Sequence, residues 1–126
     1  MILVDSSVWI DYFRGGEKSN QLPMLIELDL ICTNEIILSE LLPILQHRNQ
    51  KEIIESLKAL KYLPYTIFWD GIRALKLLNL QNGINKVGLP DLMIAQHCID
   101  ENAELWSFDK HFKLMATHTS LKLMGL

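Results

Sequence analysis

Short apolar runs alternate with segments of helical periodicity, and this alternation restricts the fold more than any other feature of the sequence. The first run, residues 1–4, is followed by Asp5 and by a helix-like segment that extends through Phe13. An apolar run this short is typical of a strand buried on both faces. Repetition of such strand and helix pairs predicts an α/β fold with a mostly parallel central sheet flanked by helices on both faces.

The same two patterns predict the other elements. Further strands are expected at residues 30–33, 63–67, 104–108 and 121–124. Helices are expected at residues 6–13, 19–28, 36–46, 50–61, 70–81, 91–101 and 110–116. The side chains suited to cap three of these helices are Ser6 or Ser7, Thr33 or Asn34, and Asp70. No repeat or linker interrupts the pattern, so residues 1–126 are expected to form one domain.

Composition excludes several classes of protein. Apolar residues make up 49% and charged residues 21% of the sequence, as in a folded domain and unlike a disordered chain. The longest apolar runs have four residues, so no transmembrane helix or signal peptide is expected, and the predicted location is cytoplasmic. Cys32 and Cys98 are far apart and lack the spacing of a zinc site.

The net charge of −3 argues against a uniformly basic nucleic-acid-binding protein, but the charges are unevenly distributed. Acidic residues predominate in residues 1–46, whereas basic residues predominate in residues 48–86. An acidic region beside a basic one is expected of a metal site next to a phosphate-binding surface. The alternative is that most of these lysines are only the solvated faces of amphipathic helices.

Three aspartates occupy positions at one predicted edge of the sheet. Asp5 and Asp109 each follow a predicted strand, and Asp91 opens a helix directly after the turn at residues 88–90. Ligands bind at the carboxyl edge of open parallel sheets. Taken singly, Asp5 and Asp109 are explained as Asx turns and Asp91 as a partner of the helix dipole. Their convergence at one edge favours a shared site.

Glu40 joins this group because of its surroundings in the predicted helix. Its neighbours three and four positions away are Ile36, Ile37, Pro43 and Ile44. A carboxylate buried on an apolar face must be protonated, paired or bound to a metal. The alternative is an exposed glutamate on a helix with a narrow polar side.

Four carboxylates at one edge repel one another unless a cation lies between them. Oxygen ligands without cysteine or histidine favour Mg²⁺ or Mn²⁺. Such an ion is the usual apparatus for chemistry at a phosphate, because it activates water and offsets the negative charge. The pattern therefore predicts a metal-dependent enzyme that carries out chemistry at a phosphate group.

Four segments resemble PIN-domain ribonucleases, especially the VapC-type toxins of toxin–antitoxin pairs. They are MILVDSSVWIDYF at residues 1–13, SELL at 39–42, VGLPDLMIA at 87–95 and LWSFDKHF at 105–112. The resemblance covers the whole chain, with the segments in the family's order. Each segment alone is weakly specific, and their combination is what identifies the family.

The resemblance implies an active enzyme with an intact quartet of catalytic and metal-binding acids, which here are Asp5, Glu40, Asp91 and Asp109. It further implies that Ser6 and Ser107 orient carboxylates or water. It implies a homodimer, inhibited by a cognate antitoxin, that cleaves RNA such as tRNA or rRNA with a metal-activated water. The expected products carry a 5′-phosphate and a 3′-hydroxyl.

Three other functions are open at this stage. An aspartyl-phosphate phosphohydrolase also begins with a strand and an aspartate, but it needs a second aspartate where Ser7 stands. A non-catalytic binding module would have no use for four clustered acids. A histidine-dependent ribonuclease would need its histidines at the site. Of these, His97 is expected to pack in the core, while His111 lies close enough to Asp109 to touch substrate.

Overall fold

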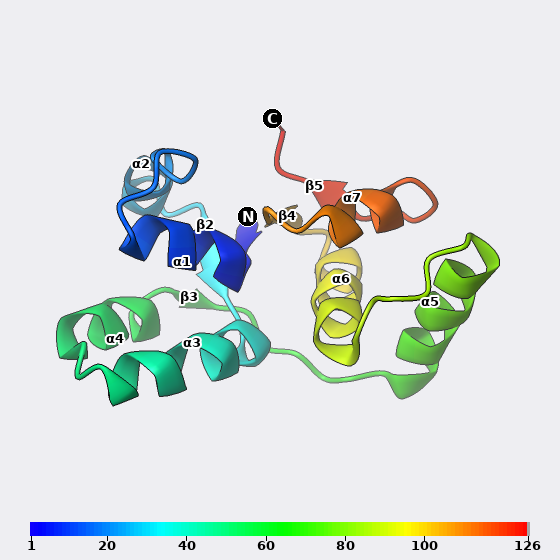
Figure 1. Ribbon diagram of the computed structural model, residues 1–126, viewed down its shortest axis with the longest axis horizontal. Helices are drawn as coiled ribbons and strands as arrows, with labels where there is room; N and C mark the ends of the chain where they lie inside the picture. The colour runs from blue at the N-terminus through cyan, green and yellow to red at the C-terminus, as the bar shows by residue number, and fades with distance from the viewer. Residues whose placement is uncertain (126) are drawn as a thin grey trace.

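A five-stranded sheet forms the centre of the molecule (Figure 1). The computed structural model describes residues 1–125, whose strands are β1 (Ile2–Val4), β2 (Ile31–Thr33), β3 (Lys61–Tyr62), β4 (Glu104–Trp106) and β5 (Lys122–Leu123). Their order is β3-β2-β1-β4-β5, and every neighbouring pair is parallel. The α/β fold predicted from the sequence is confirmed.

The helices lie on both sides of the sheet. In the described part of the chain they are α1 (Ser6–Phe13), α2 (Leu22–Glu27), α3 (Glu35–His47), α4 (Lys51–Lys58), α5 (Trp69–Gln81), α6 (Leu89–Glu101) and α7 (Lys110–Ala116). Figure 1 shows α1–α4 together on one side of the strands and α5–α7 on the other. Within residues 1–125, no helix combines the length and hydrophobicity needed to span a bilayer.

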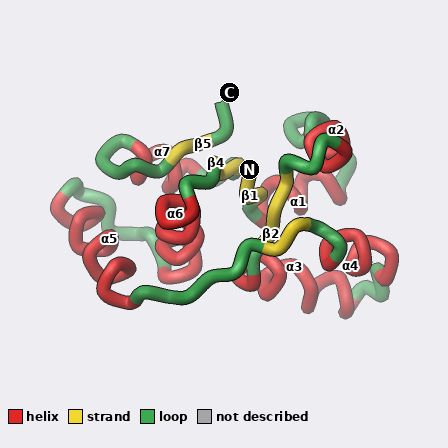
Figure 2. The backbone as a smooth tube through the Cα atoms, turned by 180° about the vertical axis from the view of Figure 1, so that it is seen from behind, coloured by secondary structure: helices red, strands yellow, loops and turns green. Residues whose placement is uncertain are grey.

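The strand order explains this division of the helices. The chain moves outward from β1 through β2 to β3, and then returns across the sheet to β4 and β5. Figure 2 shows the long connection that leads from β3 to α5. Because crossovers between parallel strands are right-handed, the change of direction places the later helices on the opposite face.

Strand β1 is the central strand, and its burial explains the apolar run at the start of the sequence. Leu3 lies between Cys32 of β2 and Leu105 of β4, and all three residues are fully buried. A central strand covered by helices on both faces has no exposed side for a polar residue. The first polar side chain, Asp5, therefore comes at the carboxyl end of this strand.

The cap of α3 follows its sequence signal. The side chain of Asn34 accepts a hydrogen bond of 2.9 Å from the backbone N–H of Ile37, as expected of an N-cap. Helix α6 begins with Pro90 in its first turn after Gly88, also as expected.

Three local predictions are wrong. The strand expected at residues 63–67 lies instead at Lys61–Tyr62, since Pro64 has no N–H to donate and so ends the edge strand. Asp70 does not cap α5; it lies in the first turn and forms an ion pair of 2.9 Å with Arg73. At α1 the N-cap position belongs to Asp5 and not to a serine.

Candidate active site

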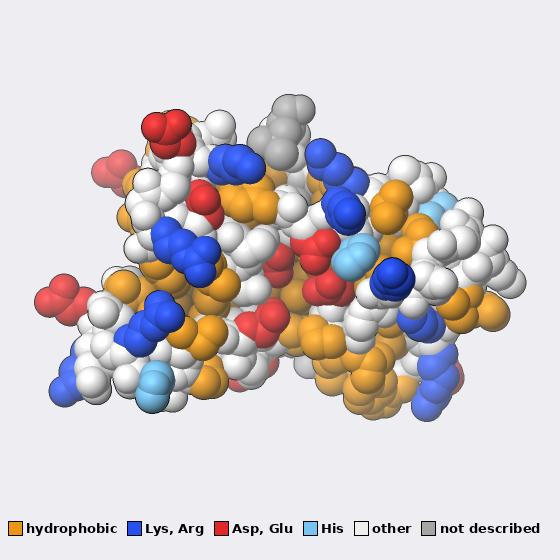
Figure 3. Space-filling view, in the orientation of Figure 1, with side chains coloured by type: hydrophobic (Ala, Val, Ile, Leu, Met, Phe, Trp, Pro, Cys, Tyr) orange, Lys and Arg blue, Asp and Glu red, His pale blue; other side chains and the backbone are white. Residues whose placement is uncertain are grey.

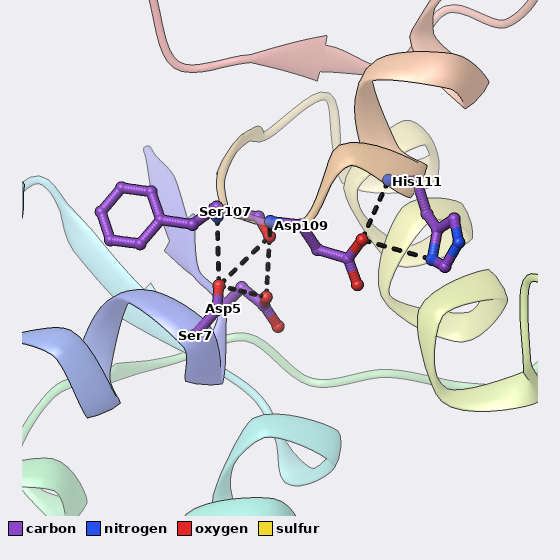
Figure 4. Close-up of polar contacts among 6 residues, drawn as sticks. Asp5, Ser7, Ser107, Asp109 and His111 are labelled. Carbon is purple, nitrogen blue, oxygen red and sulfur yellow. Dashed lines mark hydrogen bonds and ion pairs between the residues drawn. The ribbon is translucent and has the colours of Figure 1, made fainter.

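Asp5 is the most deeply buried of the four candidate acids, with 5% of its surface exposed. It follows β1, and its backbone N–H donates to the carbonyl of Trp106 at 2.9 Å. Its carboxylate Oδ2 accepts hydrogen bonds from the hydroxyls of Ser7 at 2.8 Å and Ser107 at 2.7 Å (Figure 4). Two hydroxyls thus orient the carboxylate, and both bonds end on the same oxygen.

Ser7 and Ser107 join the start of α1 to the loop after β4. Their hydroxyl oxygens are 3.3 Å apart. Ser7 Oγ accepts from the backbone N–H of Phe108 at 3.1 Å, and Ser107 Oγ accepts from that of Asp109 at 3.0 Å. The contact expected of Ser107 is present. The sequence reasoning did not place Ser7 at the site; it considered Ser7 as a helix cap and as the residue that stands where a phosphohydrolase needs an aspartate. The signal was a hydroxyl two residues after a buried aspartate.

Asp109 occupies the N-cap position of α7. Its Oδ1 accepts a hydrogen bond of 2.9 Å from the backbone N–H of His111. The ring Nδ1 of His111 lies 3.2 Å from the same oxygen. Figure 4 shows that the imidazole and the carboxylate face each other at the beginning of α7.

Asp91 lies in the first turn of α6 and is half-buried. Ligand atoms of Asp91, Asp109 and His111 lie within 4.8 Å of one another. Burial, together with the charges of Asp109 and Asp5, raises the pKa of Asp91 from 3.8 to about 6, and His111 opposes this shift. The charge contribution to this shift shows that two further carboxylates lie close to Asp91.

Glu40 differs from the expectation that it is buried. Its side chain is exposed on α3, so the apolar residues three and four positions away in the sequence did not indicate burial. Partial desolvation by neighbouring atoms nevertheless raises the pKa of Glu40. The negative charges of Asp5 and Asp91 raise it further, each by a smaller amount. A hydrogen bond from the Ser6 hydroxyl opposes the shift. Glu40 therefore shares the electrostatic environment of the cluster but lies at its outer margin.

The four acids come from four separated parts of the chain. Asp5 and Asp109 are the N-cap residues of α1 and α7, Asp91 lies in the first turn of α6, and Glu40 lies within α3. Figure 3 shows acidic side chains gathered in the middle of one face, with basic side chains on either side of them. Of the basic residues in the segment 48–86, two already have protein partners. Arg73 pairs with Asp70, and Lys76 donates to the carbonyl of Val87 at 3.1 Å.

The donor set fits a divalent cation. Carboxylate oxygens are the ligands that Mg²⁺ and Mn²⁺ prefer, and an ion among them would offset the charges of Asp109 and Asp5, which add to the effect of burial on the pKa of Asp91. Asp91 and Asp109 already lie within the spacing of a shared ion, and the buried Asp5 contributes a further charge next to them.

A comparison with models of protein families identifies the family, and solved structures show the same fold. A model of the PIN domain matches residues 2–117. The chain is similar to VapBC2 from Rickettsia felis bound to a DNA fragment from its promoter, with 23% identity over 98% of both chains and a TM-score of 0.77. It is also similar to DNA-bound VapBC from Salmonella typhimurium, with 17% identity over 98% of this chain and 96% of that one, and a TM-score of 0.77.

A third solved structure, FitAcB from Neisseria gonorrhoeae, shares 15% identity over 99% of this chain and 97% of that one, with a TM-score of 0.64. A comparison with curated protein sequences gave no match. At these identities the solved structures establish the fold, whereas the domain match spans most of the sequence and includes all four acids. The chain therefore belongs to the PIN domain family.

Proposed function

We propose that this protein is a metal-dependent endoribonuclease and the toxin of a toxin–antitoxin pair. The observation that carries the proposal is the convergence of Asp5, Glu40, Asp91 and Asp109 at one edge of the sheet, where burial and then the charges of neighbouring acids raise the pKa values of Glu40 and Asp91. A nuclease fits the PIN family, and a toxin fits the VapBC and FitAcB structures that share this fold.

Asp5, Asp91 and Glu40 would hold Mg²⁺ or Mn²⁺, and Asp109 would complete the acidic pocket. When bound, the ion supplies an acidified water and offsets the charge of the scissile phosphate. The hydroxyls of Ser7 and Ser107 keep the Asp5 carboxylate in one orientation. Glu40, exposed at the margin, is accessible to the water and substrate that enter from solvent. Attack of this water on the scissile phosphorus, in line with the leaving 3′-oxygen, would leave a 5′-phosphate and a 3′-hydroxyl. The 2′-hydroxyl of the RNA would take no part in the reaction.

The proposed substrate is RNA, including structured RNA such as tRNA or rRNA. Basic side chains on either side of the acidic cluster would contact the phosphate backbone and position it without reading its sequence (Figure 3). Because an RNA-cleaving toxin meets its substrate in the cytoplasm, we assign the activity to that compartment. The free and buried thiols of Cys32 and Cys98 are compatible with a reducing environment.

The direct test is cleavage of total RNA by the purified protein. Cleavage is expected with Mg²⁺ or Mn²⁺, is expected to stop with EDTA, and should yield 5′-phosphate ends. Cleavage that persists in chelator, or products with 2′,3′-cyclic phosphates, would contradict the proposal. Release of phosphate from small phosphomonoesters would instead support a phosphohydrolase, and RNA binding without cleavage would support a binding module.

The proposed antitoxin needs an exposed apolar surface to bind. A groove of about 730 Å³ lies between α1, α2 and α4, and its lining includes Trp9, Phe13, Ile26, Ile53 and Leu57. We assign the antitoxin to this groove, which lies apart from the acids. Ile26→Asp should abolish co-purification with the protein encoded by the adjacent reading frame. An unaffected complex would place the antitoxin elsewhere.

A second apolar surface supports the proposed homodimer. Leu77, Leu80 and Leu89 are each about half exposed, at 56%, 49% and 56%, and line a depression of about 440 Å³ between α5 and the start of α6. Exposed apolar clusters of this kind favour association. Light scattering should give twice the monomer mass for the wild type and the monomer mass for Leu77→Glu. A wild-type monomer would contradict the dimer.

A further inference from the structure

An imidazole stands among the carboxylates of the candidate site. His111 lies in the first turn of α7, and its side chain and that of Asp109 are 30% and 35% exposed. One ligand atom from each of Asp91, Asp109 and His111 lies within 4.8 Å of the other two. The site therefore differs from the oxygen-only set expected from the sequence, and the difference bears on which metal it selects.

The local backbone holds His111 beside Asp109. The N–H of His111 donates to Asp109 Oδ1 at 2.9 Å, and this bond closes the turn that places the ring next to the same oxygen. A carboxylate oxygen has a second lone pair, so the bond leaves it able to bind a cation. The backbone conformation of Asp109 and His111 therefore already places one ligand atom of each residue close to Asp91.

The spacing of the two donors suits joint coordination. Nδ1 of His111 and Oδ1 of Asp109 are 3.2 Å apart. Two ligands at adjacent corners of an octahedral ion, each about 2.1 Å from the metal, are about 3.0 Å apart. The same distance also suits a direct hydrogen bond between the imidazole and the carboxylate, in which His111 would only orient Asp109. These two arrangements differ in one measurable property, which is whether a nitrogen contacts the ion.

We infer that His111 is a metal ligand together with Asp91 and Asp109, and that its nitrogen gives the site a preference for Mn²⁺ over Mg²⁺. This inference rests on the metal site of the proposed function. Mg²⁺ is a hard ion that prefers oxygen, whereas imidazole binds the transition metals more readily. A single nitrogen ligand is therefore enough to separate the two ions, even though the carboxylates accept both.

The experiment uses full-length protein without a histidine tag, so that no foreign imidazole is present. The Mn²⁺ complex is measured by pulsed electron paramagnetic resonance, which detects ¹⁴N nuclei bound to the ion. His111→Ala is the test variant. His47→Ala is the matched control, because His47 is exposed at the end of α3 and lies outside the metal-binding group of Asp91, Asp109 and His111. The dissociation constants for Mn²⁺ and Mg²⁺ are measured by calorimetry on the same three proteins.

The wild type and His47→Ala should show ¹⁴N coupling, and His111→Ala should lose it. Loss of His111 should also weaken Mn²⁺ binding by at least about tenfold, with a smaller effect on Mg²⁺, because loss of even an outer-shell partner of a metal costs this much. Circular dichroism and melting curves check that the variant is folded.

Mn²⁺ binding without nitrogen coupling in the wild type would overturn the inference and leave the nuclease proposal intact. Equal losses for Mn²⁺ and Mg²⁺ in His111→Ala would overturn the proposed selectivity. Nitrogen coupling in a protein that does not cleave RNA would support the inference while the nuclease proposal fails. Resonance and calorimetry thus test the metal ligand, and RNA cleavage independently tests the nuclease activity.

Discussion

The side-chain amide of Asn34 donates a hydrogen bond of 2.8 Å to Nδ1 of His97, and both residues are completely buried. Asn34 caps α3, which carries Glu40, and His97 lies on α6, which carries Asp91. Nε2 of His97 donates in turn to the carbonyl of Pro64 at 3.1 Å. A buried polar network therefore links the two helices that bring acids to the candidate site, and His97 has the packing role expected from the sequence.

Removing this link should destabilise the protein. Asn34→Ala takes away the cap of α3 and leaves Nδ1 of His97 without its donor, so the free energy of unfolding should fall by about 1–3 kcal/mol. Urea denaturation measures the change. The matched control is Asn85→Ala in the exposed loop before α6, where a change within about 0.5 kcal/mol is expected. Equal effects at the two positions would show that the network is not a major source of stability.

The stability contributed by His97 should depend on pH. Burial lowers the pKa of His97 below its ordinary value of 6.5. Below that pH the unfolded chain takes up a proton that the folded chain does not, so this contribution is present above pH 6.5 and is lost as the pH falls toward the folded pKa. The difference in unfolding free energy between the wild type and His97→Gln should shrink on acidification. A difference that is constant with pH would contradict this assignment.

Asp91→Asn should separate activity from stability. The variant removes one charge from the cluster, so RNA cleavage should fall by more than about a hundredfold, while the metal-free protein should melt no lower than the wild type. The pKa of Asp91 rises from 3.8 to about 6 on folding, so the wild type loses stability as the pH rises through that window. The advantage of the variant should therefore appear above about pH 6 and vanish below about pH 4.

Melting curves with and without Mg²⁺ complete this test. The ion should raise the melting temperature of the wild type more than that of Asp91→Asn, because a ligand stabilises the state that binds it. A variant with wild-type activity and an unchanged metal response would show that Asp91 is only a partner of the helix dipole.

The two hydroxyls that hold Asp5 should act as a unit. Ser7→Ala and Ser107→Ala each remove one hydrogen bond to Oδ2, and each should lower cleavage by about tenfold. Because the two serines also contact each other, the double variant should lose less than the product of the single losses. Rates are measured on one RNA substrate with Ser120→Ala, an exposed serine, as the control. Full activity in the double variant would remove these hydroxyls from the mechanism.

Calcium should occupy the site without supporting turnover. Ca²⁺ accepts irregular shells of carboxylate oxygens, so it should bind and protect the protein against thermal unfolding. It is larger than Mg²⁺ and acidifies water less, so cleavage should be far slower than with Mg²⁺. Melting curves measure binding and RNA assays measure turnover. Equal rates with the two ions would contradict a role for the metal in activating water.

Local signals in the sequence were sufficient for most of the elements. The apolar run before Asp5 predicted β1, a cap at Thr33 or Asn34 predicted the start of α3, and Pro90 after Gly88 predicted the start of α6. Each of these signals acts within a few residues, through capping, through the fixed φ of proline or through burial on both faces of a strand. The carboxyl ends of parallel strands then predicted that Asp5 and Asp109 lie at one edge of the sheet, and the start of α6 predicted the same for Asp91.

Only the tertiary structure decided the contacts that join distant segments. Ser7 meets Ser107 across 100 residues, Asn34 meets His97 across 63, and neither pairing leaves a periodic signal in the sequence. Glu40 has apolar neighbours in its helix and is nevertheless exposed, because exposure depends on which other elements pack against that face. Residue type and spacing therefore determined which side chains were available to the site, whereas packing between helices determined which of them meet.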